Sequence, residues 1–331
     1  MEKARNWLVG VGISIAALVI AFWGVRPGRF ATVLSDAEYI YIIPAALMLV
    51  LGLIARARSW QILLKGRISL RRSFDALNEG YLLNNVLPLR LGELGRAYVV
   101  SRDLNSPLEP VLATVVVERL IDAIVSFIGL LIAVPFIVSP DWTQNVILAV
   151  GVILLIVLAA MVVLLTQRER INGWLGKLPA KGLWGLDAII DGFIGGMEVL
   201  RDPKTVLKAA FWSLMAWVTA WVQIWLLLRM YGESGSLVVS LFVSGIVAFG
   251  AAIPSSPGAV GVYELSALAG LLAFDYSRET ALSVAITGHM LQLVITSAFG
   301  AWALAREGET LTGLAAKTQT LFRKTQNHPV S

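Results

Sequence analysis

The segment Asn84–Val100 reads NNVLPLRLGELGRAYVV, and it decides the fold. It places two arginines, a glutamate, two asparagines and a proline between long runs of Leu, Val, Ile and Ala. If those runs cross a membrane, charged side chains among them are costly unless they face a bundle interior or a watery cavity. The segment therefore predicts a break in a membrane-embedded helix, surrounded by protein.

The composition supports a membrane protein. Of 331 residues, 57% are hydrophobic and 15% are charged, whereas soluble domains average about 45–50% apolar and about 25% charged residues. The absence of cysteine excludes disulfides and thiolate metal sites. The net charge of +5 lies mainly in loops, where Lys and Arg report orientation and attract anionic lipid headgroups. We therefore expect no nucleic-acid partner.

Six apolar segments are long enough to cross a bilayer. They are Trp7–Val25, Glu38–Ala55, Val111–Val138, Val146–Thr166, Ala209–Leu228 and Ala281–Leu304. Lysine and arginine are concentrated near the N-terminus, after the second segment, in the loop 167–208 and in the tail 307–331. The positive-inside rule then places the termini and that loop in the cytoplasm.

This orientation holds only if two interrupted segments return to the side from which they enter. Residues 73–102 would dip in from the cytoplasm, and residues 237–273 from the outside. The sequence thus predicts an all-α integral membrane protein, a polytopic bundle of about six spans with two opposed re-entrant helical hairpins, resembling an inverted repeat. The transmembrane domain would cover residues 1–306, followed by a polar cytoplasmic tail. An alternative is that both halves of the second hairpin cross fully.

Proline and glycine mark both breaks. The first contains Pro88 and Gly92, and the second contains Pro254, Pro257, Gly258 and Gly261. Such breaks persist at membrane depth where protein or water satisfies the freed backbone groups. Paired interruptions of this kind point to a transport site near the midplane.

Ionisable residues follow each break. New helices beginning after Pro88 and Pro257 would offer free amides, and with Arg90 and Arg96 they could bind a phosphate. Alternatively, Arg90 pairs with Glu93 merely to close the hairpin. Ionisable residues beside both breaks favour a functional cavity over this structural reading.

The third span contains VVVERLIDAIV, with three ionisable residues at membrane depth. Glu118 and Asp122 share one helix face, and Arg119 is adjacent to it. One interpretation is a salt-bridge network that fixes helix packing. The other is that Arg119 binds a headgroup phosphate while the acids orient it or relay protons. His289, alone in the last span, is interpreted as a helix–helix hydrogen-bond partner.

NNVLPLRLGELGRAYVV, VVVERLIDAIV and IPSSPGAVGVYE, in that order, resemble the signatures of the lysylphosphatidylglycerol synthase transmembrane region, or flippase-like domain, family. The resemblance runs from about Leu47 to Arg306. It implies a bacterial or archaeal plasma-membrane protein that translocates a lipid. Relatives fused to a soluble aminoacyl-transfer domain also synthesise that lipid; we do not expect this activity here, because the sequence contains no such domain.

We therefore expect a lipid translocase that moves a phospholipid or polyprenyl-linked lipid through a polar midplane cavity, without cofactor or metal. The expected binding residues are Asn84, Asn85, Arg90, Glu93, Arg96, Glu118, Arg119, Asp122 and Glu264. The partners would be anionic phospholipid or polyprenyl phosphate, with self-association left open. The alternatives are a membrane-embedded transferase or hydrolase with Glu93 or Glu264 as the base, a small-solute transporter, and an assembly scaffold.

Overall fold

The computed structural model describes residues 2–87, 91–137, 145, 148–149, 151–152, 155–156, 198–251, 253 and 255–327. Within them the chain is helical and contains no strand. Pro88, Arg90 and Pro254, most of the expected span Val146–Thr166 and the loop up to residue 197 lie outside these residues.

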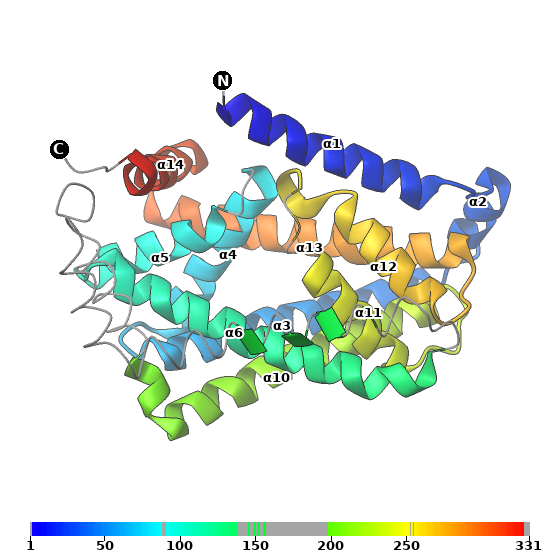
Figure 1. Ribbon diagram of the computed structural model, residues 1–331, viewed down its shortest axis with the longest axis horizontal. Coiled ribbons are helices and arrows are strands. Elements are labelled where there is room, and N and C mark those ends of the chain that lie inside the picture. Colours follow the sequence, from blue (N-terminus) through cyan, green and yellow to red (C-terminus); the bar gives the residue numbers. More distant parts are fainter. Residues whose placement is uncertain are drawn as a thin grey trace.

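The long helices lie along one bundle axis (Figure 1). Their bounds are α1 Glu2–Phe22, α3 Ile42–Leu63, α6 Leu108–Ala133, α10 Pro203–Met230 and α13 Arg278–Glu307. Short helices α2 (Pro27–Ser35) and η1 (Tyr39–Tyr41) join α1 to α3, and η4 (Glu198–Arg201) precedes α10. The apolar segments expected on these helices are thus helical.

Three of the described helices are long and apolar enough to cross a membrane. They are η1–α3, α10 and α13, and a fourth crossing results if α1 and α2, bent by 84°, count as one span. Helix α6 has 26 residues but carries the three central ionisable side chains. Exposed Ile, Leu, Val and Phe side chains cover the outside of these helices, for example Ile43, Leu207 and Val294. That surface suits lipid, so the protein is a multi-pass membrane protein.

Helix α3 extends further than the sequence predicted. The second span was expected to end at Ala55, but α3 continues to Leu63 and includes Arg56 and Arg58. Its last two turns are buried through Trp60 and Leu63, which are at most 1% exposed. Arg56 contacts a carboxylate on α6, so its charge does not end the helix.

Two helical hairpins enter the bundle from opposite ends. Helices α4 (Leu70–Val86) and α5 (Gly92–Asp103) form the first, and α11 (Leu237–Gly250) and α12 (Val262–Leu272) form the second. We call the end where α3 and α13 finish the basic end, because Lys65, Arg67 and Lys208 lie there. The first hairpin starts from the basic end and the second from the opposite end (Figure 1).

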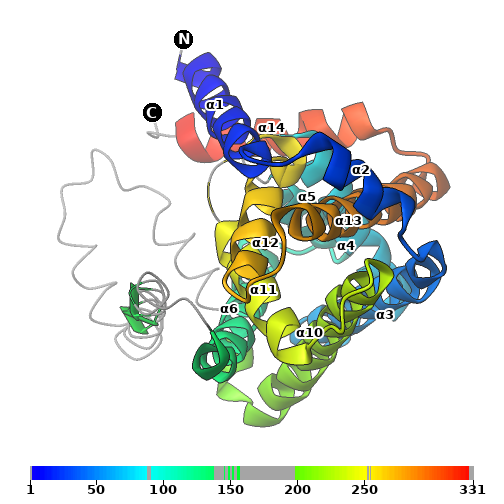
Figure 2. The same cartoon turned by 90° about the vertical axis from the view of Figure 1, so that its right-hand side faces the viewer.

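The hairpin tips meet inside the bundle. The short helix η5 (Pro257–Ala259), between α11 and α12, packs against α4. A Cβ atom placed on Gly258 would lie 3.8 Å from the Asn85 carbonyl oxygen. Figure 2, which looks along the bundle, shows α4 and α13 near its centre and α1 at its edge beside α12. The sequence-predicted breaks are therefore adjacent in space.

Glycine and side-chain caps explain several helix contacts and ends. A Cβ on Gly92 would lie 1.9 Å from the Gly80 carbonyl oxygen, so α4 and α5 can approach closely only with glycine there. The side chains of Ser69, Ser236 and Ser277 accept hydrogen bonds from amides in the first turns of α4, α11 and α13. Such caps satisfy amides that the helix leaves unpaired.

The sequence predicted a polar tail after residue 306. In the structure, part of this tail is a helix that packs against the bundle. After Gly308 ends α13 in a left-handed conformation, α14 (Leu311–Asn327) packs against α5. Leu314 and Thr318 are at most 1% exposed. Because they are four residues apart, they lie on one face of α14 and form a buried stripe on a mainly polar helix. The polar composition of the segment does not reveal this stripe.

Candidate functional site

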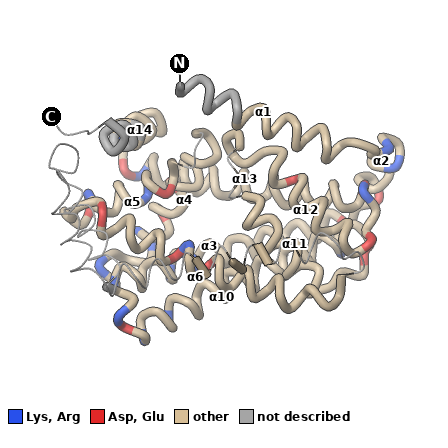
Figure 3. The backbone as a smooth tube through the Cα atoms, in the orientation of Figure 1, with Lys and Arg blue, Asp and Glu red and all other residues tan. Residues whose placement is uncertain are grey.

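Five charged side chains from three helices meet in the bundle. We call them the arginine–carboxylate cluster: Arg56 on α3, Arg96 on α5, and Glu118, Arg119 and Asp122 on α6. Figure 3 shows charge concentrated at the two ends of the bundle, with few charged positions between them, at α6 and α12. The cluster therefore joins three helices through charges placed among apolar residues.

Glu118 lies at the centre of the cluster. Its Oε2 is 2.8 Å from Arg96 Nη1, its Oε1 is 2.7 Å from Arg119 Nη2, and Arg56 Nη1 is 3.9 Å from Oε1. The Glu118 side chain is 1% exposed. The Arg96 contact is an ion pair without good hydrogen-bond geometry. The Arg96 guanidinium lies 4.6 Å from the ring centroid of Trp60, which adds a cation–π contact.

Asp122 has a different set of partners. It pairs with Arg56, and its Oδ2 lies 3.2 Å from Arg119 Nη2. From α10, the Ser213 hydroxyl and the Trp217 indole N–H donate to Oδ1 at 2.6 and 3.3 Å. A buried carboxylate is tolerated when its oxygens are paired in this way. Asp122 thus ties α6 to α3 and α10.

Among the described residues, direct contacts leave the cluster with one positive charge in excess, because three arginines face two carboxylates. Arg119 has the most exposed side chain of the five, at 40%. Its Nε is buried and has no hydrogen-bond partner among the described residues. Arg119 therefore keeps an exposed face and a free donor, whereas Arg56 and Arg96 connect α3 and α5 to α6.

The first hairpin tip is organised by two asparagines. Asn84 Oδ1 accepts from the Gly92 amide at 2.7 Å, and Asn84 Nδ2 donates to Glu93 Oε2 at 3.2 Å. Asn84 thus caps α5 and holds the first glutamate. Asn85 Nδ2 donates across to α13, to the hydroxyls of Thr296 and Ser297 at 3.1 and 2.9 Å. Glu93 also lies within electrostatic range of Arg119.

The second hairpin tip contains a buried carboxylate–imidazole pair. Glu264 Oε1 lies 2.6 Å from His289 Nδ1 on α13, and Glu264 Oε2 accepts from the Gly261 amide at 2.6 Å. His289 Nε2 lies 2.8 Å from the Gly258 carbonyl oxygen, and its ring stacks on Tyr263 with centroids 4.2 Å apart. His289 does join two helices, as its position in the sequence predicted.

The structure separates the expected binding residues into these two groups. Arg96, Glu118, Arg119 and Asp122 come together with Glu93 nearby, whereas Glu264 pairs with His289 and with no arginine among the described residues. Among the described residues, Glu264 therefore does not contact the arginines with which it was expected to bind one headgroup. Carboxylate and imidazole are close enough to satisfy each other.

Arg56 follows the expected second span, which ends at Ala55, and it was not among the expected binding residues. The pattern that could have revealed it is its spacing of four from Trp60 on a helix that remains apolar beyond Ala55. For Arg90, which was expected to bind phosphate, no position is described. Pro88 and Pro254 are in the same situation.

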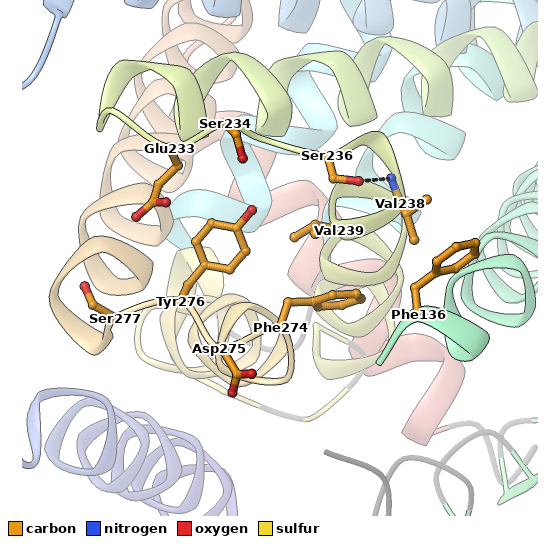
Figure 4. Close-up of a pocket in the computed structure, with 10 residues that line it drawn as sticks. All are labelled: Phe136, Glu233, Ser234, Ser236, Val238, Val239, Phe274, Asp275, Tyr276 and Ser277. Carbon is orange, nitrogen blue, oxygen red and sulfur yellow. Dashed lines mark hydrogen bonds between the residues drawn. The ribbon is translucent and has the colours of Figure 1, made fainter. Parts of the chain in front are cut away.

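Two cavities lie at the ends of the bundle. The first, about 500 Å³, lies where α10 ends and α11 and α13 begin, and Figure 4 shows its lining of Glu233, Ser236, Phe274 and Tyr276 among others. The second, about 780 Å³, lies at the basic end beside Arg58, Lys65, Lys208 and Trp212. Neither lining includes a residue of the two buried clusters, so these cavities are not the midplane cavity expected from the sequence.

Comparison with known proteins decides the family. A family model described as the lysylphosphatidylglycerol synthase TM region matches residues 7–300. The chain belongs to this family. The expected resemblance is thereby confirmed, and it covers the helices from α1 to α13.

Three relatives have low sequence identity to this chain, but each match extends over most of it. A UPF0104 membrane protein of Methanothermobacter thermautotrophicus is 22% identical, over 94% of this chain and 98% of its own. A UPF0104 membrane protein of Pyrococcus horikoshii is 21% identical, over 88% and 94%. Glycosyltransferase AglD of Haloferax volcanii is 22% identical over 92% of this chain, which spans 55% of that protein.

Proposed function

We propose that the protein translocates a phosphate-bearing lipid, either an anionic phospholipid or a polyprenyl phosphate, between the two leaflets. The observation that carries the proposal is Arg119, a partly exposed cation in a cluster with one excess positive charge, whose buried Nε has no partner among the described residues. Within a bilayer such a group is expected to mark a path for an anion rather than to serve packing alone.

The cluster is suited to transient rather than permanent binding of a phosphate. Arg119 already contacts Glu118 and Asp122, so an incoming phosphate would exchange with these carboxylates instead of entering an empty cationic site. Exchange keeps every charge paired and avoids the desolvation cost of a free buried ion. The lipid chains would remain in the bilayer beside the apolar outer faces of the helices.

The proposed topology has six spans and two re-entrant hairpins of opposite orientation, in the plasma membrane, with both termini in the cytoplasm. It is supported by the antiparallel entry of the two hairpins and by the concentration of Lys and Arg at the basic end. The meeting tips then lie near the midplane. Movement of one tip against the other would expose the cluster to one leaflet at a time.

Purified protein in liposomes tests the proposal. Head-labelled phosphatidylglycerol and a polyprenyl phosphate serve as separate probes, and transfer is followed by quenching of the outer leaflet. Arg119→Ala should slow transfer about tenfold or more, the effect of losing a charge-assisted hydrogen bond of about 1.5 kcal/mol. Arg102→Ala is the matched control, because its side chain is 43% exposed against 40% for Arg119 but lies in the surface network at the basic end.

Normal transfer of both probes by a folded Arg119→Ala protein would refute the proposal. A second candidate is glycosyl transfer to a lipid-linked acceptor, which the name of the Haloferax relative suggests. Translocation leaves the lipid mass unchanged, whereas glycosyl transfer adds the mass of a sugar. Mass spectrometry of the recovered lipid therefore distinguishes the two functions.

A further inference from the structure

The hydrogen bonds of His289 fix how many protons the Glu264–His289 pair holds. His289 is 2% exposed, and its Nε2 lies 2.8 Å from the Gly258 carbonyl oxygen. A carbonyl oxygen only accepts, so Nε2 must carry a hydrogen. The 2.6 Å contact between Nδ1 and Glu264 Oε1 then requires one more proton, on either atom. The pair is therefore neutral overall and shares one titratable proton.

This shared proton fastens the tip of the second hairpin. Glu264 Oε2 accepts a hydrogen bond from the Gly261 amide, and His289 Nε2 donates one to the Gly258 carbonyl oxygen. The pair therefore hydrogen-bonds to both ends of the turn. Gly258 and Gly261 have φ values of +70° and +88°, which only glycine adopts readily. The turn also contacts α1, where the Ser256 amide donates to Ser14 Oγ at 2.9 Å. Three elements thus meet at the pair.

We propose that Glu264 and His289 form a proton-dependent latch that fastens the α11–α12 tip to α13. With the shared proton in place, the contact between Nδ1 and Oε1 is attractive. When that proton leaves to water, the Nδ1 lone pair and the carboxylate oxygen face each other, and the contact becomes repulsive. The tip is then released from α13. No other bond is formed or broken.

The latch rests on the proposed function only in its consequence, which is that proton uptake and release would move one hairpin tip against the other. That movement would couple lipid transfer to a proton gradient. The tip of the first hairpin lies beside the second, because η5 packs against α4 near Asn85. A change at the latch therefore reaches the tip that carries Asn84 and Glu93.

Other titratable groups on the packed elements are remote along their helices. Tyr263 stacks directly on His289, and α11 contains no charged residue. The remaining charges on the helices packed against α12 and α13 occur near helix ends, in the arginine–carboxylate cluster or, for Asp75 and Glu79 within α4, in ion pairs with Arg306 and Arg72. They are Glu2, Lys3, Arg5, Arg29, Arg56, Arg58, Arg71, Arg72, Asp75, Glu79, Lys204, Lys208, Arg229, Arg278, Glu279, Arg306 and Glu307. A pH response at the tip that depends on His289 thus reports the pair itself.

The test uses spin labels, since the natural chain has no cysteine to interfere. Labels at Ile15→Cys on α1 and Ile253→Cys beside the tip occupy side chains that are 57% and 48% exposed. Dipolar broadening between them is measured from about pH 5.5 to about pH 9.5, a range that spans the usual titration of imidazole. We expect the broadening to fall as pH rises, because the tip leaves its closed position.

His289→Gln provides the decisive comparison, because a glutamine amide can donate to Gly258 but does not titrate. The pH response should disappear in His289→Gln and in Glu264→Gln. Labels at Ile54→Cys and Leu214→Cys, on α3 and α10, should show no pH response in either background. An unchanged response in both variants, or none in the natural background, would overturn the latch.

Protein folding and lipid transfer are kept separate in this experiment. Thermal unfolding shows whether His289→Gln and Glu264→Gln retain the fold. If only one of them does, its pH response is compared with that of the natural background. The spin-label readout needs no lipid movement, so a failed latch and a failed translocase give different results. A pH-responsive tip in a protein that transfers neither lipid probe would leave the latch intact and refute the proposed function.

Discussion

Arg96 and Glu118 form a buried ion pair, with Nη1 2.8 Å from Oε2 and side chains that are 4% and 1% exposed. Arg96 follows the first hairpin break on α5, whereas Glu118 lies in the middle of α6. Because Arg119 and Arg56 approach the other Glu118 oxygen, this carboxylate holds three cations together. The folded state is therefore expected to depend strongly on Glu118, whereas replacement of Arg119 should change its stability little.

The first prediction is that Glu118→Gln destabilises the protein strongly. Removal of this charge leaves three arginines facing Asp122 alone, and loss of one partner of a buried pair typically costs about 3–5 kcal/mol. Arg119→Ala should cost about 1 kcal/mol or less, because it leaves two arginines for two carboxylates and removes a partly exposed side chain. Reversible unfolding in mixed detergent micelles measures both losses.

Glu109→Gln serves as the control for Glu118→Gln, since Glu109 lies in the first turn of the same helix. It should lose only the helix-dipole contribution of about 0.3–1 kcal/mol. Equal losses for Glu118→Gln and Arg119→Ala would contradict the division into a structural carboxylate and a surplus cation. The transfer experiment on Arg119→Ala would then report instability rather than binding.

The sequence predicts the breaks better than it predicts the partners. Proline and glycine are local signals, so the breaks expected within residues 73–102 and 237–273 fall between α4 and α5 and between α11 and α12. The pairing of Glu264 with His289 depends on how α12 packs against α13, residues 25 apart in the chain. No local pattern encodes that contact, and a lone histidine gives little indication of it.

Charge misled the prediction at two helix ends. The expected second span ends at Ala55, directly before Arg56, and arginine is costly in lipid. Its cost is offset by Asp122, 66 residues away, which local reading does not reveal. In the tail, abundant polar residues concealed the buried stripe around Leu314. In both places a tertiary contact outweighed the composition of the segment.

The second prediction concerns the backbone at the second tip. Gly261 and Gly24 both have positive φ, +88° and +78°, but a Cβ on Gly261 would lie 2.3 Å from the Ser14 carbonyl oxygen, whereas nothing lies within 4 Å at Gly24. Gly24→Ala should therefore cost only the left-handed backbone strain of about 1–2 kcal/mol. Gly261→Ala should cost clearly more, because α1 must also move away from the tip.

Thermal unfolding of the two alanine variants measures this difference directly. Gly12→Ala is a further control, since it lies on α1, and nothing lies within 4 Å of its Cβ position. It should be neutral or slightly stabilising. If Gly24→Ala and Gly261→Ala unfold at the same temperature, the close packing of α1 on the turn is absent in solution.

The third prediction is that Leu314 attaches α14 to the bundle. Leu314 is 1% exposed and belongs to the hydrophobic core that contains Leu83, Ala97 and Val100. Leu314→Ala should weaken this attachment by about 2–5 kcal/mol, the usual cost of such a truncation in a core. Because α14 packs against α5 at the edge of the bundle (Figure 1), the loss should appear as local release rather than global unfolding. Limited proteolysis after Gly308 measures it.

Thr320→Ala is the matched control for Leu314→Ala, because Thr320 lies on the exposed face of α14 and donates to the Ala316 carbonyl of its own helix. Its proteolysis rate should equal that of the natural protein.

Lys317 pairs with Glu309 and keeps the pKa of that carboxyl below its usual value. A group with a lowered pKa stabilises the folded state above its unfolded pKa and loses this effect as pH falls. Release of α14, measured by the same proteolysis, should therefore increase below about pH 4.5. For the Leu314→Ala prediction, cleavage no faster than that of the natural protein would show that α14 is held by other contacts.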